Sequence, residues 1–284
     1  MDKQTMKNLQ PAIKWSGSKR SQAEQIISYF PKQIDTYYEP FCGGASVFAR
    51  LYMNRKTSIK HFVLSDINND LMSLYKVIQN NPIQLCEHYE SLWNELNKDD
   101  NINRKKEYFS SIRQRFNREH DPMDFMFIMR TTTNGMPRYN QNGEFNNSFH
   151  VTRNGMLPNK LRDIIGQWHN MLQDVELRTC SYNEITPNEN DFMYLDPPYA
   201  NTTGMYYGKI DYSHLWGYLN NIKSSWALSF DGMTNKDDYT QNVPLIYDKH
   251  IYIKSGNSSF RRVIGNNRNV IVYESLYIKN KSRL

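Results

Sequence analysis

Short apolar runs alternate with one-sided amphipathic stretches along residues 11–80 of the chain. Within residues 71–79 the apolar positions recur at the spacing of a helix with one buried face: Leu71, Leu74, Tyr75 and Ile78. The pattern predicts helices over 21–30, 45–53 and 71–79, and strands over 36–39 and 61–65. This alternation of strand and helix is typical of a parallel α/β sheet.

The same kind of pattern returns after residue 166. Residues 191–195 and 226–230 are compact apolar runs, and residues 269–278 alternate between apolar and polar side chains. We therefore predict three further strands in this part of the chain.

Residues 81–165, between these two blocks, are rich in Asn, Arg and Lys and lack long β-branched runs. They predict a mostly helical module. A turn-dense segment over 131–149 contains Asn142-Gly143, a strong hairpin signal, and the predicted hairpin spans 136–145. A hairpin of this kind fits a groove of DNA. We predict one domain formed by 1–80 and 166–284, with an inserted domain at 81–165.

Charge and composition narrow the classes of function. A net charge of +6 and a pI near 9.0 favour a polyanionic partner, although a solvated basic surface accounts for them equally well. No apolar run is long enough to cross a bilayer and the first ten residues are polar, so we expect a soluble, unexported, cytoplasmic protein without membrane contact. Cys42, Cys86 and Cys180 are widely separated, and the histidines lack paired spacing. We therefore expect neither a disulfide framework nor a metal site.

The most specific signal is Asp196-Pro197-Pro198-Tyr199, which directly follows the apolar run 192–195. Ligand crevices in open α/β sheets lie beyond the carboxyl ends of the strands. Two prolines fix the backbone, so the Asp196 carboxylate and the Pro197 carbonyl can accept hydrogen bonds from one planar amino group. Such acceptors localise a lone pair that is otherwise delocalised into an aromatic ring, on which Tyr199 can stack. A proline-rich turn capped by an aspartate is the structural alternative.

A second signal is a glycine turn at residues 39–46, between a predicted strand and a predicted helix. Glycines at such a turn let the backbone approach a nucleotide-like ligand closely. Asp66 ends the next predicted strand, where an acidic side chain can bind both ribose hydroxyls. The pair predicts an adenosine-containing ligand. The two motifs do not by themselves separate S-adenosylmethionine (SAM) from NAD. The spacing of the glycines departs from G-x-G-x-x-G, however, and this argues against a dehydrogenase.

Together with residues 13–20, these motifs resemble the Dam-type DNA adenine methyltransferases of bacteria and phages, in the same order and from about residue 11 to 278. The resemblance implies a SAM-dependent methyltransferase fold, a Rossmann-like mixed sheet with helices on both faces. It also implies catalytic roles at the target base for Asp196, Pro197 and Tyr199. The implied SAM contacts are Lys14, Trp15, Lys19, Phe41, Gly43, Asp66 and Asp196. Gly17-Ser18 stands where the family commonly has two glycines. The structural alternative is that Trp15 belongs to the core and that Lys19 is solvated.

Residues 134–146 resemble the recognition hairpin of the same family. The resemblance implies DNA contacts from Asn134, Met136, Arg138 and Asn140. The donor fork of Arg138 suits a guanine in the major groove, and Met136 can touch a thymine methyl. Ser148 stands where readers of GATC commonly have proline, which leaves the third base of the site open. A phosphate contact or a surface ion pair is the alternative for Arg138.

Two weaker candidates follow later in the chain. Residues 228–231 come after a predicted strand and resemble a segment that lines the family's base pocket. Residues 255–262 form a polar, basic, turn-rich run that can hold a DNA backbone. An ordinary strand end and a solvated loop explain them equally well.

We therefore expect an enzyme that methylates the exocyclic amino group of adenine in a short site of duplex DNA, with GATC as the leading candidate. Because base pairing buries that amino group, the base must flip out of the helix. Two alternatives stay open: an amino-methyltransferase that acts on RNA or on a protein amide, and a DNA-binding protein that has lost catalysis. The expected partner is duplex DNA, a cognate restriction endonuclease is a candidate partner, and the expected state is a monomer or weak dimer.

Overall fold

The computed structural model describes residues 9–54, 56–199, 210–235, 237–256 and 271–280. The chain forms two compact units. Of the described residues, the first unit comprises 9–18 and 66–179, and the second comprises 19–54, 56–65, 180–199, 210–235, 237–256 and 271–280. Among the described residues, every helix is too short or too polar to cross a lipid bilayer.

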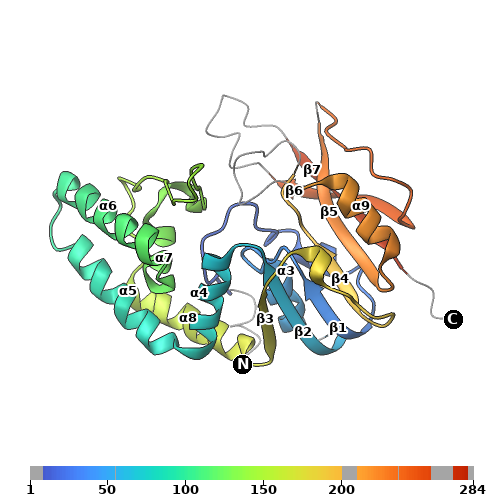
Figure 1. Ribbon diagram of the computed structural model, residues 1–284, viewed down its shortest axis with the longest axis horizontal. Coiled ribbons are helices and arrows are strands. Elements are labelled where there is room, and N and C mark those ends of the chain that lie inside the picture. The colour runs from blue at the N-terminus through green and yellow to red at the C-terminus, as the bar shows by residue number, and fades with distance from the viewer. Residues whose placement is uncertain (1–8, 55, 200–209, 236, 257–270, 281–284) are drawn as a thin grey trace. The chain divides into compact units, whose positions relative to one another are not determined.

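The described strands form a seven-stranded mixed sheet in the order β3-β2-β1-β4-β5-β7-β6 (Figure 1). β1 pairs in parallel with β2 and β4, β4 pairs in parallel with β5, and β7 runs antiparallel to both β5 and β6. The strands are β1 Gln33–Glu39, β2 Ser58–Asp66, β3 Val175–Thr179, β4 Phe192–Leu195, β5 Ser225–Thr234, β6 Lys249–Gly256 and β7 Val272–Lys279. The predicted α/β class and mixed sheet are confirmed.

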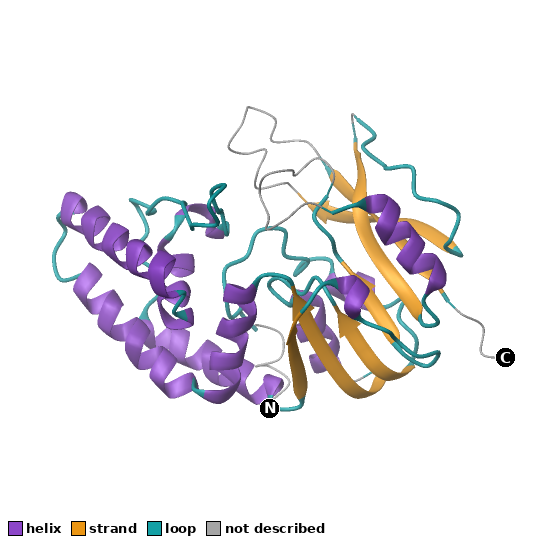
Figure 2. Ribbon diagram, viewed as in Figure 1, coloured by secondary structure: helices purple, strands orange, loops and turns teal. Residues whose placement is uncertain are grey.

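In the second unit, helices cover both faces of the sheet, as predicted (Figure 2). Alternate residues of a strand point to opposite faces. On one face, the rings of Phe192 and Tyr194 lie 4.5 and 5.9 Å from the ring of Phe30, just after helix α2 (Ala23–Ile27). On the other face, Met193 and Leu195 share a buried cluster with residues of helix α9 (Tyr212–Asn221). Helix α3 (Ser46–Asn54) follows β1.

The first unit is mostly helical. Its helices are α4 Asn69–Asn80, α5 Pro82–Leu96, α6 Ile102–Glu119, α7 Pro122–Thr131 and α8 Pro158–Leu172. Three of them begin with proline, whose fixed φ suits a first helical turn. The other two helices have asparagine caps: Asn68 caps α4 and Asn101 caps α6, because each side chain accepts backbone N–H groups at the helix start. Asp121 caps α7 in the same way, in addition to its first-turn proline. The helical character predicted for 81–165 is present in α5, α6 and α7.

The compact first unit extends beyond the predicted insert, because α4 and α8 pack against α5 and against each other. The functional division into 1–80 with 166–284 and an insert at 81–165 stays a prediction. Short 3₁₀ turns occur at Thr133–Gly135 (η1) and Tyr182–Glu184 (η2).

The predicted hairpin over 136–145 is present as a tight turn with isolated pairings instead of continuous strands. Tyr139 pairs with Phe145, and Thr132 pairs with Phe149. Gly143 adopts φ 78°, and its N–H donates to the Asn140 carbonyl at 3.0 Å. The Asn-Gly signal therefore located the turn correctly, while the flanking polar residues do not sustain a ladder.

Candidate functional site

Asp196 directly follows β4, a fully buried strand that pairs with β1 and β5. Its Oδ1 lies 2.8 Å from the Lys19 Nζ, and the same ammonium lies 3.3 Å from Oε2 of Glu274 on β7. The Lys19 side chain is 6% exposed, whereas both carboxylates are 18% exposed. We call Lys19, Asp196 and Glu274 the charged triad. It places a buried cation between two carboxylates that solvent still reaches.

Tyr199 completes this cluster. Its hydroxyl donates to Oε2 of Glu274 at 3.0 Å, and the Lys19 Nζ lies 4.8 Å from the centre of its ring. The Pro198 carbonyl accepts a hydrogen bond from the Tyr212 hydroxyl at 2.9 Å, which ties the turn to α9. The rigid turn expected from two prolines is thus anchored at its carboxyl end as well.

Burial and charge set the protonation of the two carboxylates. Burial raises the pKa of Asp196 to about 6, although Lys19 favours the ionised form and limits the rise. For Glu274, burial opposes ionisation, but Lys19 together with the hydroxyls of Ser255 and Tyr199 outweighs it and lowers the pKa. At neutral pH both carboxylates are therefore ionised, and the charged triad carries one net negative charge.

A second buried acid lies behind this cluster at the end of β1. Glu39 is 3% exposed, and its Oε2 accepts the Tyr37 hydroxyl at 2.6 Å. Burial raises the pKa of Glu39 to about 8, opposed by the Tyr37 hydrogen bond and reinforced by the charge of Asp196. Glu39 is therefore mostly protonated at neutral pH, which keeps a further negative charge away from Asp196.

The glycine turn after β1 has the backbone geometry that the sequence predicts. Gly43 and Ala45 adopt φ of 45° and 46°, in the left-handed region that suits glycine best. The Cys42 N–H donates to the Ser65 carbonyl at 3.0 Å, which joins the turn to β2. The Phe41 ring packs 5.4 Å from the Tyr182 ring. Asp66 is the last residue of β2, and its Oδ1 accepts the Asn68 N–H at 3.0 Å.

Lys14 lies against the start of the loop that carries the predicted DNA contacts. A Cβ atom on Gly135, which has φ of 60°, would come within 2.3 Å of the Lys14 Cγ. Burial lowers the pKa of Lys14, and the neighbouring Arg153 and Arg130 lower it further. Arg130 in turn donates to the carbonyls of Pro11 and Ala12. Trp15 is half-buried. Lys14 therefore belongs to a cationic group within the first unit.

Residues 132–149, which we call the recognition loop, present Arg138 as an exposed side chain and Met136 as a half-buried one. The Asn147 amide donates to the carbonyls of Thr133 and Met136, both at 3.0 Å. Asn140 forms the turn itself, since its Oδ1 accepts the N–H groups of residues 142 and 144 at 2.9 Å. The Asn134 side chain and residues 257–262 lie outside what the structure describes.

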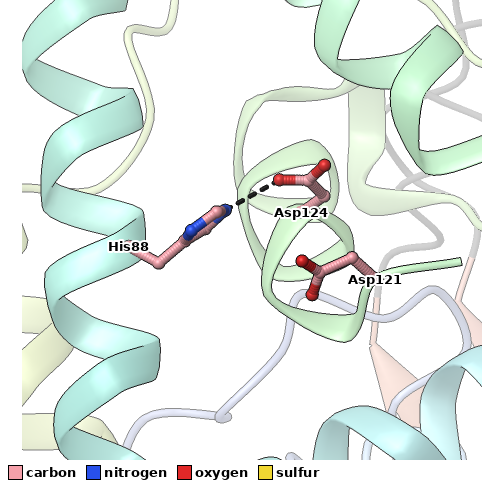
Figure 3. Close-up of side chains that lie close together, drawn as sticks. All are labelled: His88, Asp121 and Asp124. Carbon is pink, nitrogen blue, oxygen red and sulfur yellow. Dashed lines mark hydrogen bonds and ion pairs between the residues drawn. The ribbon is translucent and has the colours of Figure 1, made fainter. Parts of the chain in front are cut away.

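Asp124 anchors the helices that support this loop. It is fully buried and accepts hydrogen bonds from Arg115 at 2.6 and 2.5 Å, and its Oδ1 lies 2.7 Å from Nε2 of His88. Figure 3 shows Asp121 beside this pair, with the partners on α5 and α7. Asp121 caps α7 by accepting the Met123 N–H at 2.8 Å. Each carboxylate thus already has a structural role.

Of the residues in this cluster, the sequence motifs singled out Asp196, Tyr199 and Lys19 but not Glu274, and Glu39 entered only as the first residue of the glycine turn, without a role of its own. Both acids lie in strands that pair on two sides, where a charged residue is costly unless it has a partner. An acidic side chain inside the predicted strand over 269–278 was the available signal for Glu274. The second weaker candidate contributes Ser255, whose hydroxyl donates to Glu274 at 2.9 Å. The first contributes Ser229, which shares a 2.7 Å hydrogen bond with the Tyr194 hydroxyl.

Comparison with known proteins gives consistent matches. A family model described as D12 class N6 adenine-specific DNA methyltransferase matches residues 15–263. The chain is 33% identical over 227 residues to the type II methyltransferase M.MjaIII of Methanocaldococcus jannaschii, covering 72% of this chain and 75% of that protein. It is 29% identical over 258 residues to the type II methyltransferase M.CviBI of Paramecium bursaria Chlorella virus NC1A, covering 86% and 88%. It is 30% identical over 201 residues to the DNA adenine methylase of Vibrio cholerae, covering 69% and 67%.

Proposed function

Because the chain belongs to the D12 class N6 adenine-specific DNA methyltransferases, we propose that it transfers a methyl group from SAM to the exocyclic amino group of adenine within a short specific site of duplex DNA. GATC is the leading candidate for that site. The base flips out of the duplex, because pairing and stacking otherwise hide the amino group. The transfer is direct, from the sulfonium to the nitrogen.

One observation carries the proposal: an ionised, partly exposed carboxylate stands at the end of buried strand β4 with an aromatic ring beside it. Asp196 and the Pro197 carbonyl accept the two N–H groups of the amino nitrogen and localise its lone pair. Tyr199 stacks on the base. As the nitrogen forms its new bond it becomes positively charged, and the net negative charge of the charged triad stabilises that charge. Asp196 then takes up the proton that the nitrogen releases.

The residues present fit SAM as the methyl donor. The left-handed turn at Gly43 and Ala45 gives a close backbone approach, and the Phe41 ring offers an apolar surface. In this proposal Asp66 holds the ribose hydroxyls, and Lys14, Trp15 and Lys19 complete the binding residues. Bound SAM supplies an electrophilic methyl group on its sulfonium. The negative charge of Asp196 attracts that positively charged sulfonium.

Recognition of the site is assigned to the recognition loop. Arg138 reads a guanine through its donor fork, and Met136 contacts a thymine methyl. Asn134 and Asn140 are the further proposed contacts, although Asn140 also holds the turn through two hydrogen bonds. The serine at position 148 leaves the third base to be determined. A cognate restriction endonuclease and a monomeric or weakly dimeric state belong to the same proposal.

Replacement of the acceptor carboxylate tests the function. We expect Asp196→Ala to lose nearly all methyl transfer to duplex DNA while SAM binding, measured by calorimetry, is retained. Asp248→Ala is the control, because Asp248 pairs with Lys279 on an exposed edge. Activity equal to that of the unaltered protein would show that the acceptor role is misassigned.

The substrate is tested with the unaltered protein. Labelled SAM is offered with duplex DNA, with RNA and with protein, and the methylated DNA is then sequenced with detection of modified adenines. Preferential labelling of RNA or protein would favour another class of amino-methyltransferase. If none of the three substrates is labelled, a DNA-binding protein without catalysis is favoured. We expect labelled adenine in a single short sequence.

A further inference from the structure

Asp70 is a buried acid that the proposed chemistry does not use. It lies in the first turn of α4 and is 7% exposed. Its Oδ2 accepts the Tyr139 hydroxyl at 2.7 Å, and its Oδ1 lies 2.9 Å from Nδ1 of His120. A buried carboxylate is costly without such partners. Its contacts therefore join α4, the end of α6 and the recognition loop at one point.

Tyr139 is the neighbour of Arg138 and is fixed on two sides. Its ring meets the Phe145 ring edge-on at 5.8 Å, and the two residues pair across the turn. Phe145 is 1% exposed, and the Asn117 side chain bonds its backbone N–H and carbonyl at 2.9 and 3.1 Å. The Asn146 N–H donates to the Arg138 carbonyl at 2.9 Å. The Arg138 backbone is thus held while its side chain is exposed.

We infer that Tyr139 is a positioning residue for base recognition: its hydroxyl, anchored on Asp70, fixes the backbone from which Arg138 reaches its base pair. The inference rests on the proposed function, in which Arg138 reads a base. A bidentate contact to a base edge requires both donors in register, whereas a phosphate contact tolerates displacement. Loss of the anchor therefore impairs discrimination more than it impairs binding or methyl transfer.

The anchor is distinct from the contacts that close the loop. Asn147 bonds two loop carbonyls, Asn117 brackets Phe145, and the Tyr139 ring packs without help from its hydroxyl. Removing the hydroxyl alone leaves these contacts in place. Tyr139→Phe therefore separates positioning from folding of the loop.

The test measures kcat/KM on the cognate duplex and on duplexes altered at the base pair that Arg138 reads. We expect Tyr139→Phe to lower the ratio of cognate to altered activity at that pair by at least about fivefold. The single-turnover rate on saturating cognate DNA should change by less than about threefold, because Asp196 is untouched. A purely structural role would lower activity on all duplexes alike and leave the ratio unchanged, which would overturn the inference.

Matched variants assign the effect to the hydroxyl and its anchor. Tyr89→Phe is the control, since the Tyr89 hydroxyl also bonds within the first unit, donating to the Met156 carbonyl at 2.8 Å. It should lower thermal stability without changing the ratio. Asp70→Asn keeps an acceptor for Tyr139 and should keep the ratio near that of the unaltered protein. Tyr139→Phe combined with Asp70→Ala should lower the ratio no further than Tyr139→Phe alone, because both changes remove the same hydrogen bond to the Tyr139 hydroxyl. The additional loss of the His120 contact in Asp70→Ala should lower thermal stability and leave the ratio unchanged.

Arg138→Ala distinguishes failure of the inference from failure of the proposed function. If Arg138→Ala relaxes discrimination but Tyr139→Phe does not, the inference is overturned and base reading by Arg138 stands. If Arg138→Ala weakens methylation equally on every sequence, base reading fails and the inference is overturned with it.

Discussion

The Asp196 carboxylate is subject to two opposing influences. Burial favours its protonated form, while the Lys19 ammonium at 2.8 Å favours the charged form. The balance leaves the pKa at about 6, above the ordinary value for aspartate. Such a carboxylate is ionised at neutral pH and still basic enough to accept a proton, which suits the two roles proposed for it.

The pH dependence of methyl transfer follows from this value. Below pH 6 Asp196 is protonated, and a neutral carboxyl group is a weaker acceptor for the amino N–H groups. We expect the single-turnover rate to fall about tenfold for each pH unit well below 6 and to level off above 7. Rapid-quench measurements with saturating DNA and SAM would show this decline as the acidic limb of the pH–rate profile. A rate that stays constant from pH 5 to 7.5 would contradict it.

Glu274→Gln assigns that limb to Asp196. The charged and polar groups around these two acids include Lys19, Gln22, Glu39, Tyr194, Tyr199 and Ser255. The negative charge of Glu274 raises the pKa of Asp196, so its removal should move the limb to lower pH. Glu176→Gln makes the same charge change on exposed β3, where Glu176 pairs with Arg178, and should leave the limb in place. A limb that moves with neither variant would belong to another group.

At the scale of elements, Asp124 joins three helices. It bonds Arg115 on α6 and His88 on α5 while it lies fully buried in α7. Asp124→Ala removes the charge-assisted hydrogen bonds to both partners, so we expect it to cost about 3 kcal/mol of unfolding free energy. Urea unfolding followed by circular dichroism would measure it.

The control for this prediction is an exposed ion pair between α5, one of these three helices, and its neighbour α8. Arg162 on α8 and Glu90 on α5 are both nearly half exposed, so Arg162→Ala should cost less than about 1 kcal/mol. Equal losses for the two variants would show that the Asp124 contacts contribute no more than a surface ion pair.

The sequence predicted central elements better than edge elements, for a physical reason. β4 and β5 are buried on both faces and read as continuous apolar runs. β3 and β6 stand at the two edges of the sheet, where strands commonly carry charged side chains. Their charged residues interrupt the apolar pattern, so the sequence did not predict them as strands. Helix α9 was missed as well, since its sequence buries little apart from Leu215 and Leu219.

At the scale of the whole chain, local motifs located the parts of the site but not their pairing. The tetrapeptide at 196–199 predicted an acceptor carboxylate from its own residues. Nothing local connects Lys19 with Glu274, because their contact depends on β7 lying between β5 and β6 in the sheet. The same holds for Asp70 and Tyr139, which lie 69 residues apart in sequence. Contacts of this kind follow from topology, which short patterns do not encode.

The net charge of +6 leads to a prediction for DNA binding by the whole chain. Each phosphate that the protein neutralises releases condensed counterions, so the logarithm of the binding constant falls with the logarithm of salt concentration by about 0.9 per phosphate. We expect a steep linear dependence between 50 and 200 mM salt. Fluorescence anisotropy on cognate and unrelated duplexes would measure it.

Arg138→Ala gives this measurement a second use. If Arg138 reads a base edge, the variant should keep the salt slope on unrelated DNA and lose affinity mainly for the cognate duplex. If Arg138 contacts a phosphate, the slope should become shallower by about 1 on every duplex. The exposed position of Arg138, next to the anchored Tyr139, favours the first outcome. A slope that is shallower by about 1 on both duplexes would show that Arg138 contributes affinity through a phosphate contact and does not read a base.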